Sequence, residues 1–155
     1  MIEIEIPGRE ALSIAHVALD FNGTIALDGA LVPGVAERLL ALSALAEVHV
    51  LTADTFGTAA RECAGTRAQL ETFPSGAAAV QKRAIVEGHS GGVACIGNDF
   101  NDATMFAVAD LSIAVVGGEG AWAGLLAHAD VVTTTTLDAL DLLLNPDRLK
   151  ATLRW

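Results

Sequence analysis

The order of apolar and polar residues along the chain predicts strands that alternate with helices. Short β-like runs cover residues 13–19, 47–51, 92–96, 111–116 and 130–133, and stretches with helical spacing lie between them. This alternation is typical of a parallel sheet covered by helices. We therefore predict an α/β fold, a three-layer Rossmann-like parallel sheet flanked by helices.

Proline, cap residues and apolar spacing predict the helix boundaries. Pro33 suits the first turn of a helix, in which Val35, Leu39 and Leu42 lie on one apolar face. Residues 1–7 alternate apolar and acidic side chains, which predicts one more strand at the start. Further helices are expected over residues 57–64, over 75–88 with Ser75 as N-cap, after Asp102, over 140–144 and after Pro146.

The length of 155 residues fits one domain, and we predict a single domain over residues 1–155. Apolar residues make up 52% of the chain, and the mean hydropathy is +0.49. No uncharged apolar run approaches the ~18 residues of a membrane span, so we assign this apolarity to a core or a subunit interface. The start lacks the basic and apolar regions of a signal peptide, and we expect a cytoplasmic protein without membrane insertion.

The cysteines and histidines of the sequence form no redox or metal-binding motif. Cys63 and Cys95 lie far apart without a CxxC pattern, and we expect both to be buried structural thiols. The four histidines show no ligand spacing, so we interpret His16, His49, His89 and His128 as structural or surface residues.

The charge balance excludes one class of partner. Nine basic and nineteen acidic side chains give a net charge of -10, which repels a nucleic-acid backbone. The same field disfavours anionic substrates at long range. A phosphate site in this chain must therefore depend on local donors and on a cation.

Polar residues follow several predicted strands at the point where each strand ends. Asp20 ends the first long strand, Thr52 ends the second, and residues 98–102 follow the run 93–97, while Lys82 comes from the helix between them. Ligands of open α/β sheets collect beyond the carboxyl ends of the strands. Carboxylates and amides supply hard oxygen ligands, and a lysine neutralises a phosphoryl oxygen, so the set predicts a phosphate and Mg²⁺ site.

In this order the motifs resemble those of the haloacid dehalogenase (HAD) superfamily, which are hhhhDxDGT, a strand ending in Thr or Ser, a Lys, and GDxxND. The segments 51–59, 82–86 and 93–102 are similar to LTGDxxxTA, KxxIV and VAMVGDGxND of the P-type ATPase phosphorylation domain. The likeness covers about residues 13–135. The chain resembles a small soluble P-type ATPase-like branch that lacks the nucleotide-binding and membrane domains.

The resemblance implies roles for these residues. Asp20 is the nucleophile that forms an aspartyl phosphate, and Thr52 and Lys82 hold the transferring phosphoryl oxygens. Mg²⁺ is held by the Asp20 carboxylate, the Asn22 backbone carbonyl and the first polar residue of the acidic motif.

Two residues depart from the family pattern. Asn22 stands where ordinary family phosphatases carry the general acid/base Asp, and an amide cannot move a proton. Asn98 stands where the family has its first metal-binding Asp, and either the Asn98 carbonyl or the neighbouring Asp99 is the ligand. Asp102 remains for a water-mediated metal contact.

The turn after the nucleophile allows two interpretations. The Thr24 hydroxyl either donates to the nucleophile or the phosphate, or only stabilises the turn. Gly23 lies in the same phosphate-binding turn and is needed for its backbone conformation.

The segments between the motifs are too short for an inserted cap domain, so we expect a HAD-like core with no cap. The site is then open to a large substrate or covered by another subunit, and a homo-oligomer is expected. The expected partners are a small phosphorylated substrate or a phosphoprotein, with no nucleic acid.

The leading functional hypothesis is a Mg²⁺-dependent phosphohydrolase that acts through an aspartyl phosphate on Asp20 and turns over slowly because of Asn22. The alternative is a regulatory or binding protein with a HAD fold, which accepts phosphate on Asp20 or has lost turnover. Phosphate release distinguishes the two hypotheses.

Overall fold

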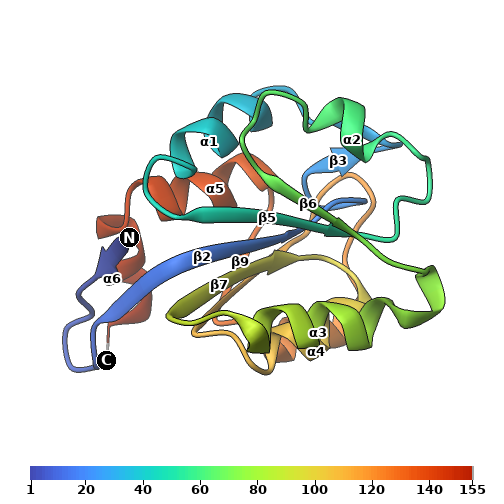
Figure 1. Ribbon diagram of the computed structural model, residues 1–155. Coiled ribbons are helices and arrows are strands. Elements are labelled where there is room, and N and C mark those ends of the chain that lie inside the picture. The colour runs from blue at the N-terminus through green and yellow to red at the C-terminus, as the bar shows by residue number, and fades with distance from the viewer. Residues whose placement is uncertain (155) are drawn as a thin grey trace.

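A parallel sheet forms the centre of the computed structural model, which describes residues 1–154 (Figure 1). The strand order is β6-β5-β2-β7-β8-β9, and every neighbouring pair in it is parallel. A short β1 pairs with β2 in the antiparallel direction. The strands are β1 Ile2–Ile4, β2 Leu12–Asp20, β5 Glu47–Thr52, β6 Gln69–Thr72, β7 Gly92–Gly97, β8 Leu111–Val115 and β9 Val131–Thr133.

Helices cover both faces of this sheet, with α1 and α5 on one face and α3 and α4 on the other (Figure 1). The helices are α1 Val35–Leu42, α2 Ala59–Glu62, α3 Ala78–Gly88, α4 Ala103–Phe106, α5 Thr136–Leu144 and α6 Asp147–Leu153. Short 3₁₀ turns cover Ser75–Ala77, Phe100–Asp102 and Ala123–His128. The predicted three-layer α/β fold with a mostly parallel sheet is therefore confirmed.

Two apolar cores lie on opposite faces of the sheet because consecutive strand residues point in opposite directions. Val17 and Leu19 of β2 pack in the core that includes Leu39 of α1. Ala18 packs in the other core, with Val86 of α3. The same alternation directs Asp20 to the face covered by α3.

The prediction of buried cysteines is also confirmed. Cys63 and Cys95 are free and buried. Burial raises the pKa of the Cys63 thiol to about 11 and raises that of Cys95 as well. Both side chains therefore remain neutral thiols at neutral pH.

A small hairpin, which the sequence pattern does not predict, follows the turn after β2. Its strands are β3 Ala26–Leu27 and β4 Ala30–Leu31, which pair in the antiparallel direction. Asp28 and Gly29 connect them with positive φ values of 51° and 80°. An Asp-Gly pair at these angles is the usual signal of a tight hairpin turn, but each strand has only two residues and carries no periodic pattern.

Three predicted helix boundaries were wrong. Pro33 precedes α1, because the N-cap is Gly34 with a φ of 90°. Helix α2 begins only at Ala59, after the Asp54 carboxylate accepts hydrogen bonds from the backbone N–H groups of Thr58 and Ala59. The stretch that begins at Ser75 is a 3₁₀ turn before α3.

Helix α5 spans Thr136–Leu144 and so includes the predicted helical residues 140–144. The Thr135 hydroxyl caps this helix by accepting a hydrogen bond from the backbone N–H of Asp138. In residues 1–154, no helix has both the length and the apolar character needed to cross a membrane.

The segments that follow β2 and β5 are short. The first holds the β3–β4 hairpin and α1, and the second holds α2 and β6. Within residues 1–154 neither segment contains a further folded unit, which agrees with the predicted absence of a cap.

One ion pair joins α1 to α5. Arg38 donates from Nε and Nη2 to the two carboxylate oxygens of Asp141, at 2.7 and 2.9 Å. These hydrogen bonds hold the pKa of Asp141 below its usual value. A lowered carboxyl pKa stabilises the fold above the pKa of the unfolded chain, and this contribution is lost as the pH falls through the folded-state pKa.

Replacing Asp141 by asparagine is therefore expected to lower the urea midpoint slightly at pH 7, with a difference that shrinks as the pH approaches 4. The effect is small because partly exposed ion pairs contribute little. Urea unfolding of both proteins at several pH values measures it. The control is Asp147→Asn, which removes a carboxylate with 88% exposure. An Asp141→Asn midpoint equal to that of the original chain at pH 7 would contradict the expectation.

Candidate active site

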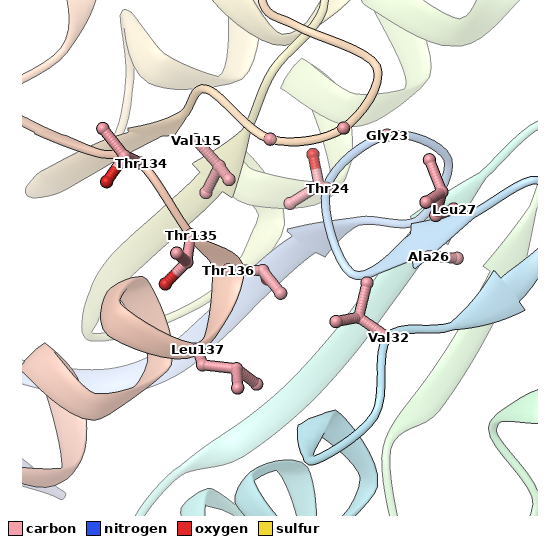
Figure 2. A pocket seen from close by; sticks show the side chains of 12 residues that line it. Gly23, Thr24, Ala26, Leu27, Val32, Val115, Thr134, Thr135, Thr136 and Leu137 are labelled. Carbon is pink, nitrogen blue, oxygen red and sulfur yellow. The ribbon is translucent and has the colours of Figure 1, made fainter.

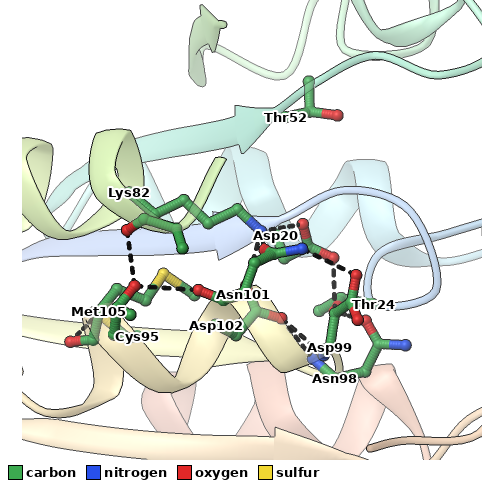
Figure 3. A network of polar contacts seen from close by, with 12 residues as sticks. Asp20, Thr24, Thr52, Lys82, Cys95, Asn98, Asp99, Asn101, Asp102 and Met105 are labelled. Atoms are coloured by element: carbon green, nitrogen blue, oxygen red, sulfur yellow. Dashed lines mark hydrogen bonds and ion pairs between the residues drawn. The ribbon is translucent and has the colours of Figure 1, made fainter. Parts of the chain in front are cut away.

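The carboxyl ends of β2, β5 and β7 border a polar pocket of about 210 Å³. Asp20 is the last residue of β2, and Thr52 is the last residue of β5. The turn at residues 98–102 follows β7, and Lys82 reaches the pocket from α3 (Figure 3). The structure thus brings together the strand-end residues that the sequence analysis singled out. The pocket is lined by Asp20, Asn22, Thr52, Ala53, Thr55, Ser75, Ala78, Lys82, Asp99 and Asn101.

Lys82 is the centre of the polar network. Its side chain is only 2% exposed, and Nζ lies 2.6 Å from Asp20 Oδ1 and 2.6 Å from Asp102 Oδ1. Nζ also donates to the Asn101 side-chain oxygen at 2.6 Å. An ammonium group has three donors, so these three contacts use its full capacity. Lys82, which extends from α3, therefore holds the Asp20 carboxylate at the end of β2 in place.

Asp102 holds the turn that follows β7. It is fully buried, and its Oδ2 accepts hydrogen bonds from the backbone N–H groups of Asn98 and Asp99 at 2.9 and 2.8 Å. A Cβ at Gly97 would collide with the Asp102 carboxylate, so this close approach requires glycine. Both carboxylate oxygens of Asp102 are engaged within the protein.

Asn98 is also engaged on both sides of its amide. Thr24 Oγ1 donates to Asn98 Oδ1 at 3.0 Å and to Asp20 Oδ2 at 3.2 Å. Asn98 Nδ2 donates to the Gly120 carbonyl at 3.1 Å. The neighbouring Gly23 has a φ of 78°, and a Cβ there would collide with the Asn98 amide. Asn98 therefore connects the turn after β2 to the loop that contains Gly120.

Three other side chains border the open part of the pocket. Asn22 Oδ1 is buried and has no hydrogen-bond partner among residues 1–154. Thr52 Oγ1 accepts from the Asp54 backbone N–H at 2.8 Å, which leaves its hydroxyl hydrogen free to donate. Asp99 Oδ2 accepts from Asn101 Nδ2 at 2.9 Å, at the exposed rim. Each of these side chains has capacity for a further polar contact.

Burial and charge govern the protonation of the network. Burial, reinforced by the charge of Asp102, raises the pKa of Asp20 to about 7, although Lys82 opposes this shift. Burial alone would lower the pKa of Lys82, but the charges of Asp20 and Asp102 raise it above its usual value. Two buried carboxylates thus face one buried ammonium group.

This arrangement suits a divalent cation. The excess negative charge favours a cation, and the unpartnered Asn22 oxygen offers it a hard ligand. Asp20 and Asp99 add carboxylate oxygens that border the same pocket. The donor set of carboxylate and amide oxygens is the type that Mg²⁺ prefers.

A second, larger cavity of about 320 Å³ lies beside the turn after β2 (Figure 2). It is lined by Gly23, Thr24, Ala26, Leu27, Val32, Val115, Gly117, Gly118, Thr134, Thr135, Thr136 and Leu137. No charged side chain borders it, so this cavity offers an anion no ionic partner. Gly23 and Thr24, which were predicted to bind phosphate, border this apolar cavity, although Thr24 also contacts Asp20.

No protein-family model matches the chain. An uncharacterized protein of Methanocaldococcus jannaschii, MJ0073, is 50% identical over 62 residues, which are 40% of this chain and 67% of that protein. A second uncharacterized protein of the same organism, MJ0072, is 54% identical over 39 residues, which are 25% of this chain and 89% of that protein.

Solved structures of HAD-family hydrolases share the fold. The cobalt-bound deoxy-D-mannose-octulosonate 8-phosphate phosphatase of Haemophilus influenzae has a TM-score of 0.68 and 18% identity, covering 89% of this chain and 91% of that chain. The 3-deoxy-D-manno-octulosonate 8-phosphate phosphatase of Moraxella catarrhalis, with magnesium ion, phosphate ion and KDO, has a TM-score of 0.68 and 18% identity, covering 91% of this chain and 94% of that chain. At this identity the likeness shows a HAD-like fold.

Replacing Lys82 by methionine is expected to destabilise the fold by about 3–5 kcal/mol, because two buried carboxylates lose their common partner. Urea unfolding at pH 7 in the presence of a chelator measures the change without compensation by a cation. Lys150→Met serves as the control, since Lys150 pairs only with the exposed Asp147. A Lys82→Met protein as stable as the Lys150→Met protein would contradict the role of the buried ion pairs.

Proposed function

Because this chain belongs to the family of the Methanocaldococcus jannaschii proteins MJ0073 and MJ0072 and has the fold of HAD-family hydrolases, we propose that it is a phosphatase with Asp20 as nucleophile. The observation that carries the proposal is the contact between the strand-end carboxylate of Asp20 and the buried ammonium of Lys82 at the polar pocket. A nucleophilic carboxylate beside a buried cation suits phosphoryl transfer.

The proposed cofactor is Mg²⁺. Of the two phosphatases compared above, one holds magnesium and the other holds cobalt, which supports a requirement for a divalent cation. We assign Asp20, Asn22 and Asp99 as the residues that hold the ion, because all three line the polar pocket. Asn98 and Asp102 orient the turn behind them, and Asp102 retains the proposed water-mediated contact. The bound cation supplies positive charge to the phosphoryl oxygens during transfer.

The proposed reaction has two steps. An oxygen of Asp20 attacks phosphorus, the ester bond to the leaving group breaks, and an aspartyl phosphate forms. Water then attacks this phosphoryl group, which leaves as inorganic phosphate and restores the Asp20 carboxylate. Thr52 donates its hydroxyl to a phosphoryl oxygen, and Lys82 shares its positive charge with the same group.

Asn22 limits the speed of both steps. Departure of an alkoxide and attack by water each need a proton transfer, and an amide cannot carry it. An acyl phosphate releases a carboxylate, which departs without a proton when Asp20 takes the phosphoryl group, so the chain phosphorylates itself from acyl phosphates more easily than it hydrolyses the aspartyl phosphate. The segments similar to the P-type ATPase phosphorylation domain support the finer assignment to a P-type ATPase-like branch.

A second candidate function rests on the same amide. With Asn22 in place of a carboxylic acid, a protein of this fold can act as a phosphate-accepting regulatory or binding module without turnover.

A homo-oligomer suits either function. Phe100 and Trp122 are 64% and 40% exposed and contact each other edge to face with ring centres 4.7 Å apart, beside Asp99. Such exposed aromatic residues are typical of interfaces.

The proposal predicts phosphate release and a phosphoprotein. In the presence of Mg²⁺ and acetyl phosphate or p-nitrophenyl phosphate, the chain is expected to release phosphate and to carry a hydroxylamine-labile phosphoryl group. Asp20→Asn and removal of the cation should abolish both signals, whereas Asp147→Asn should leave them unchanged. A phosphoprotein without phosphate release would favour the regulatory function, and the absence of both would contradict the proposed chemistry.

The role of Asn22 gives a prediction of its own. Asn22→Asp restores a group that moves protons, so turnover of p-nitrophenyl phosphate and alkyl phosphates should rise by ~10²- to 10⁴-fold. The gain with acetyl phosphate should appear in phosphate release rather than in the rate of phosphorylation. Asn145→Asp, at the exposed end of α5, makes the same chemical change away from the pocket and serves as the control. Unchanged turnover of several esters by Asn22→Asp would contradict this account.

A further inference from the structure

Three histidines that lie far apart in the sequence meet on the sheet face covered by α3. His16 lies on β2, His49 lies on β5, and His89 directly follows α3. One nitrogen from each ring lies within 4.8 Å of the others. The sequence shows no ligand spacing among these histidines, because the parallel register of β2 and β5 brings them together and sequence spacing does not reveal it.

Two of the nitrogens already have the separation of two ligands on one ion. His16 Nδ1 and His49 Nε2 are 3.2 Å apart. Two nitrogens bound tetrahedrally to zinc at ~2.0–2.1 Å lie roughly 3.3 Å from each other. Glu47 Oε2 lies 3.8 and 3.9 Å from the same two nitrogens. The three atoms surround one point between β2 and β5.

The outer nitrogens of the two rings face acceptors. His16 Nε2 lies 3.2 Å from the Ser90 carbonyl, which can only accept, so this nitrogen carries the hydrogen and Nδ1 keeps its lone pair. His49 Nδ1 lies 3.5 Å from the Glu71 carboxylate and makes no hydrogen bond among residues 1–154, so this contact does not fix the tautomer of His49. His16 Nδ1 and His49 Nε2 form one hydrogen bond when His49 carries its hydrogen on Nε2. With that hydrogen on His49 Nδ1 instead, both lone pairs face the point between β2 and β5 and can bind one cation.

This is the usual environment of metal-binding histidines. A ring that binds a metal gives its other N–H to a carbonyl or a carboxylate, which fixes the tautomer and the ring orientation. The Ser90 carbonyl occupies this outer position for His16, and a small turn of the Glu71 carboxylate, 3.5 Å from His49 Nδ1, would let it do the same for His49.

His89 supplies the third ring. Its Nε2 is buried and has no hydrogen-bond partner among residues 1–154. Its ring centre lies 4.3 Å from those of His16 and His49, and the ring stacks on that of His16 with 17° between the planes, so it must turn about its side-chain bonds to aim a nitrogen at the same ion. Glu47 is 62% exposed at the rim and can swing in as a fourth, oxygen ligand or leave that position to water. Burial, then the charges of neighbouring histidines, lowers the pKa of His49 and of His89. Both rings are therefore neutral at pH 7, as ligands must be.

We propose that His16, His49 and His89 form a structural site for a transition-metal dication, with Zn²⁺ as the preferred ion. Imidazole ligands suit zinc, whereas the oxygen-rich pocket at Asp20 suits magnesium. His16 and Asp20 are four residues apart on β2, roughly 13 Å along the strand, with Ala18 between them. The ion joins β2, β5 and the end of α3. The site is independent of the proposed phosphatase function.

The test is metal binding by the full chain in millimolar Mg²⁺, which occupies the oxygen site. The chain is expected to bind one equivalent of Zn²⁺, and Co²⁺ in its place should give the visible absorption of a four-coordinate nitrogen site. His89→Ala should weaken Zn²⁺ binding by at least ~100-fold, and Glu71→Gln by ~10- to 100-fold. Zn²⁺ should raise the melting temperature of the original chain but not that of His89→Ala.

The chain offers a matched control in its fourth histidine. His128 is exposed and outside the cluster, so His128→Ala should bind Zn²⁺ as the original chain does. His89→Ala should keep its phosphate release in Mg²⁺, which separates this inference from the proposed function. The inference is overturned if the original chain binds no Zn²⁺, if His89→Ala binds it equally well, or if Asp20→Asn rather than His89→Ala abolishes binding.

Discussion

The buried ammonium of Lys82 is the interaction on which the candidate site depends. It joins α3 to the end of β2 through Asp20 and to the turn after β7 through Asp102. Asp102 in turn holds the backbone of that turn, and Thr24 and Asn98 connect it to the turn after β2. Separate chain segments thus keep their relative positions through one charged group. A shift of α3 on the sheet would move the Asp20 side chain, because Asp20 has no other cationic partner in residues 1–154.

Because side chains alternate along β2, one face of the sheet carries apolar core residues and the other carries the polar clusters. Val17 and Leu19 face the apolar core under α1 and α5. His16, Ala18 and Asp20 face α3, so the strand carries the histidine cluster and the nucleophile on the same side. Helix α3 lies over both, with Lys82 within it and His89 directly after its end. An ion bound by the histidines would contact the end of α3, seven residues after Lys82.

The sequence predicted the parallel sheet and the residues at its carboxyl edge, because strand ends can be located from apolar runs and parallel strands end at a common edge. It did not predict which oxygen each residue contacts. Asn98 and Asp99 remained alternatives in the sequence, yet the structure gives the Asn98 amide partners on both sides and leaves Asp99 at the pocket. The sequence did not predict the histidine cluster, for a related reason. Contacts between His16 and His49 depend on strand register, which spacing along one chain does not encode.

The charge balance of the pocket gives a physical reason for the amide at position 22. Asp20 and Asp102 already place two carboxylates beside one ammonium, and the pKa of Asp20 is raised to about 7 by burial and by Asp102. A third acid in this position would add like charge at short range and raise the pKa of Asp20 further. Asn22 keeps an oxygen ligand in place without that charge, at the cost of the proton transfer that an acid would perform. The slow release of phosphate that we propose and the limited negative charge of the buried network would then both be consequences of Asn22.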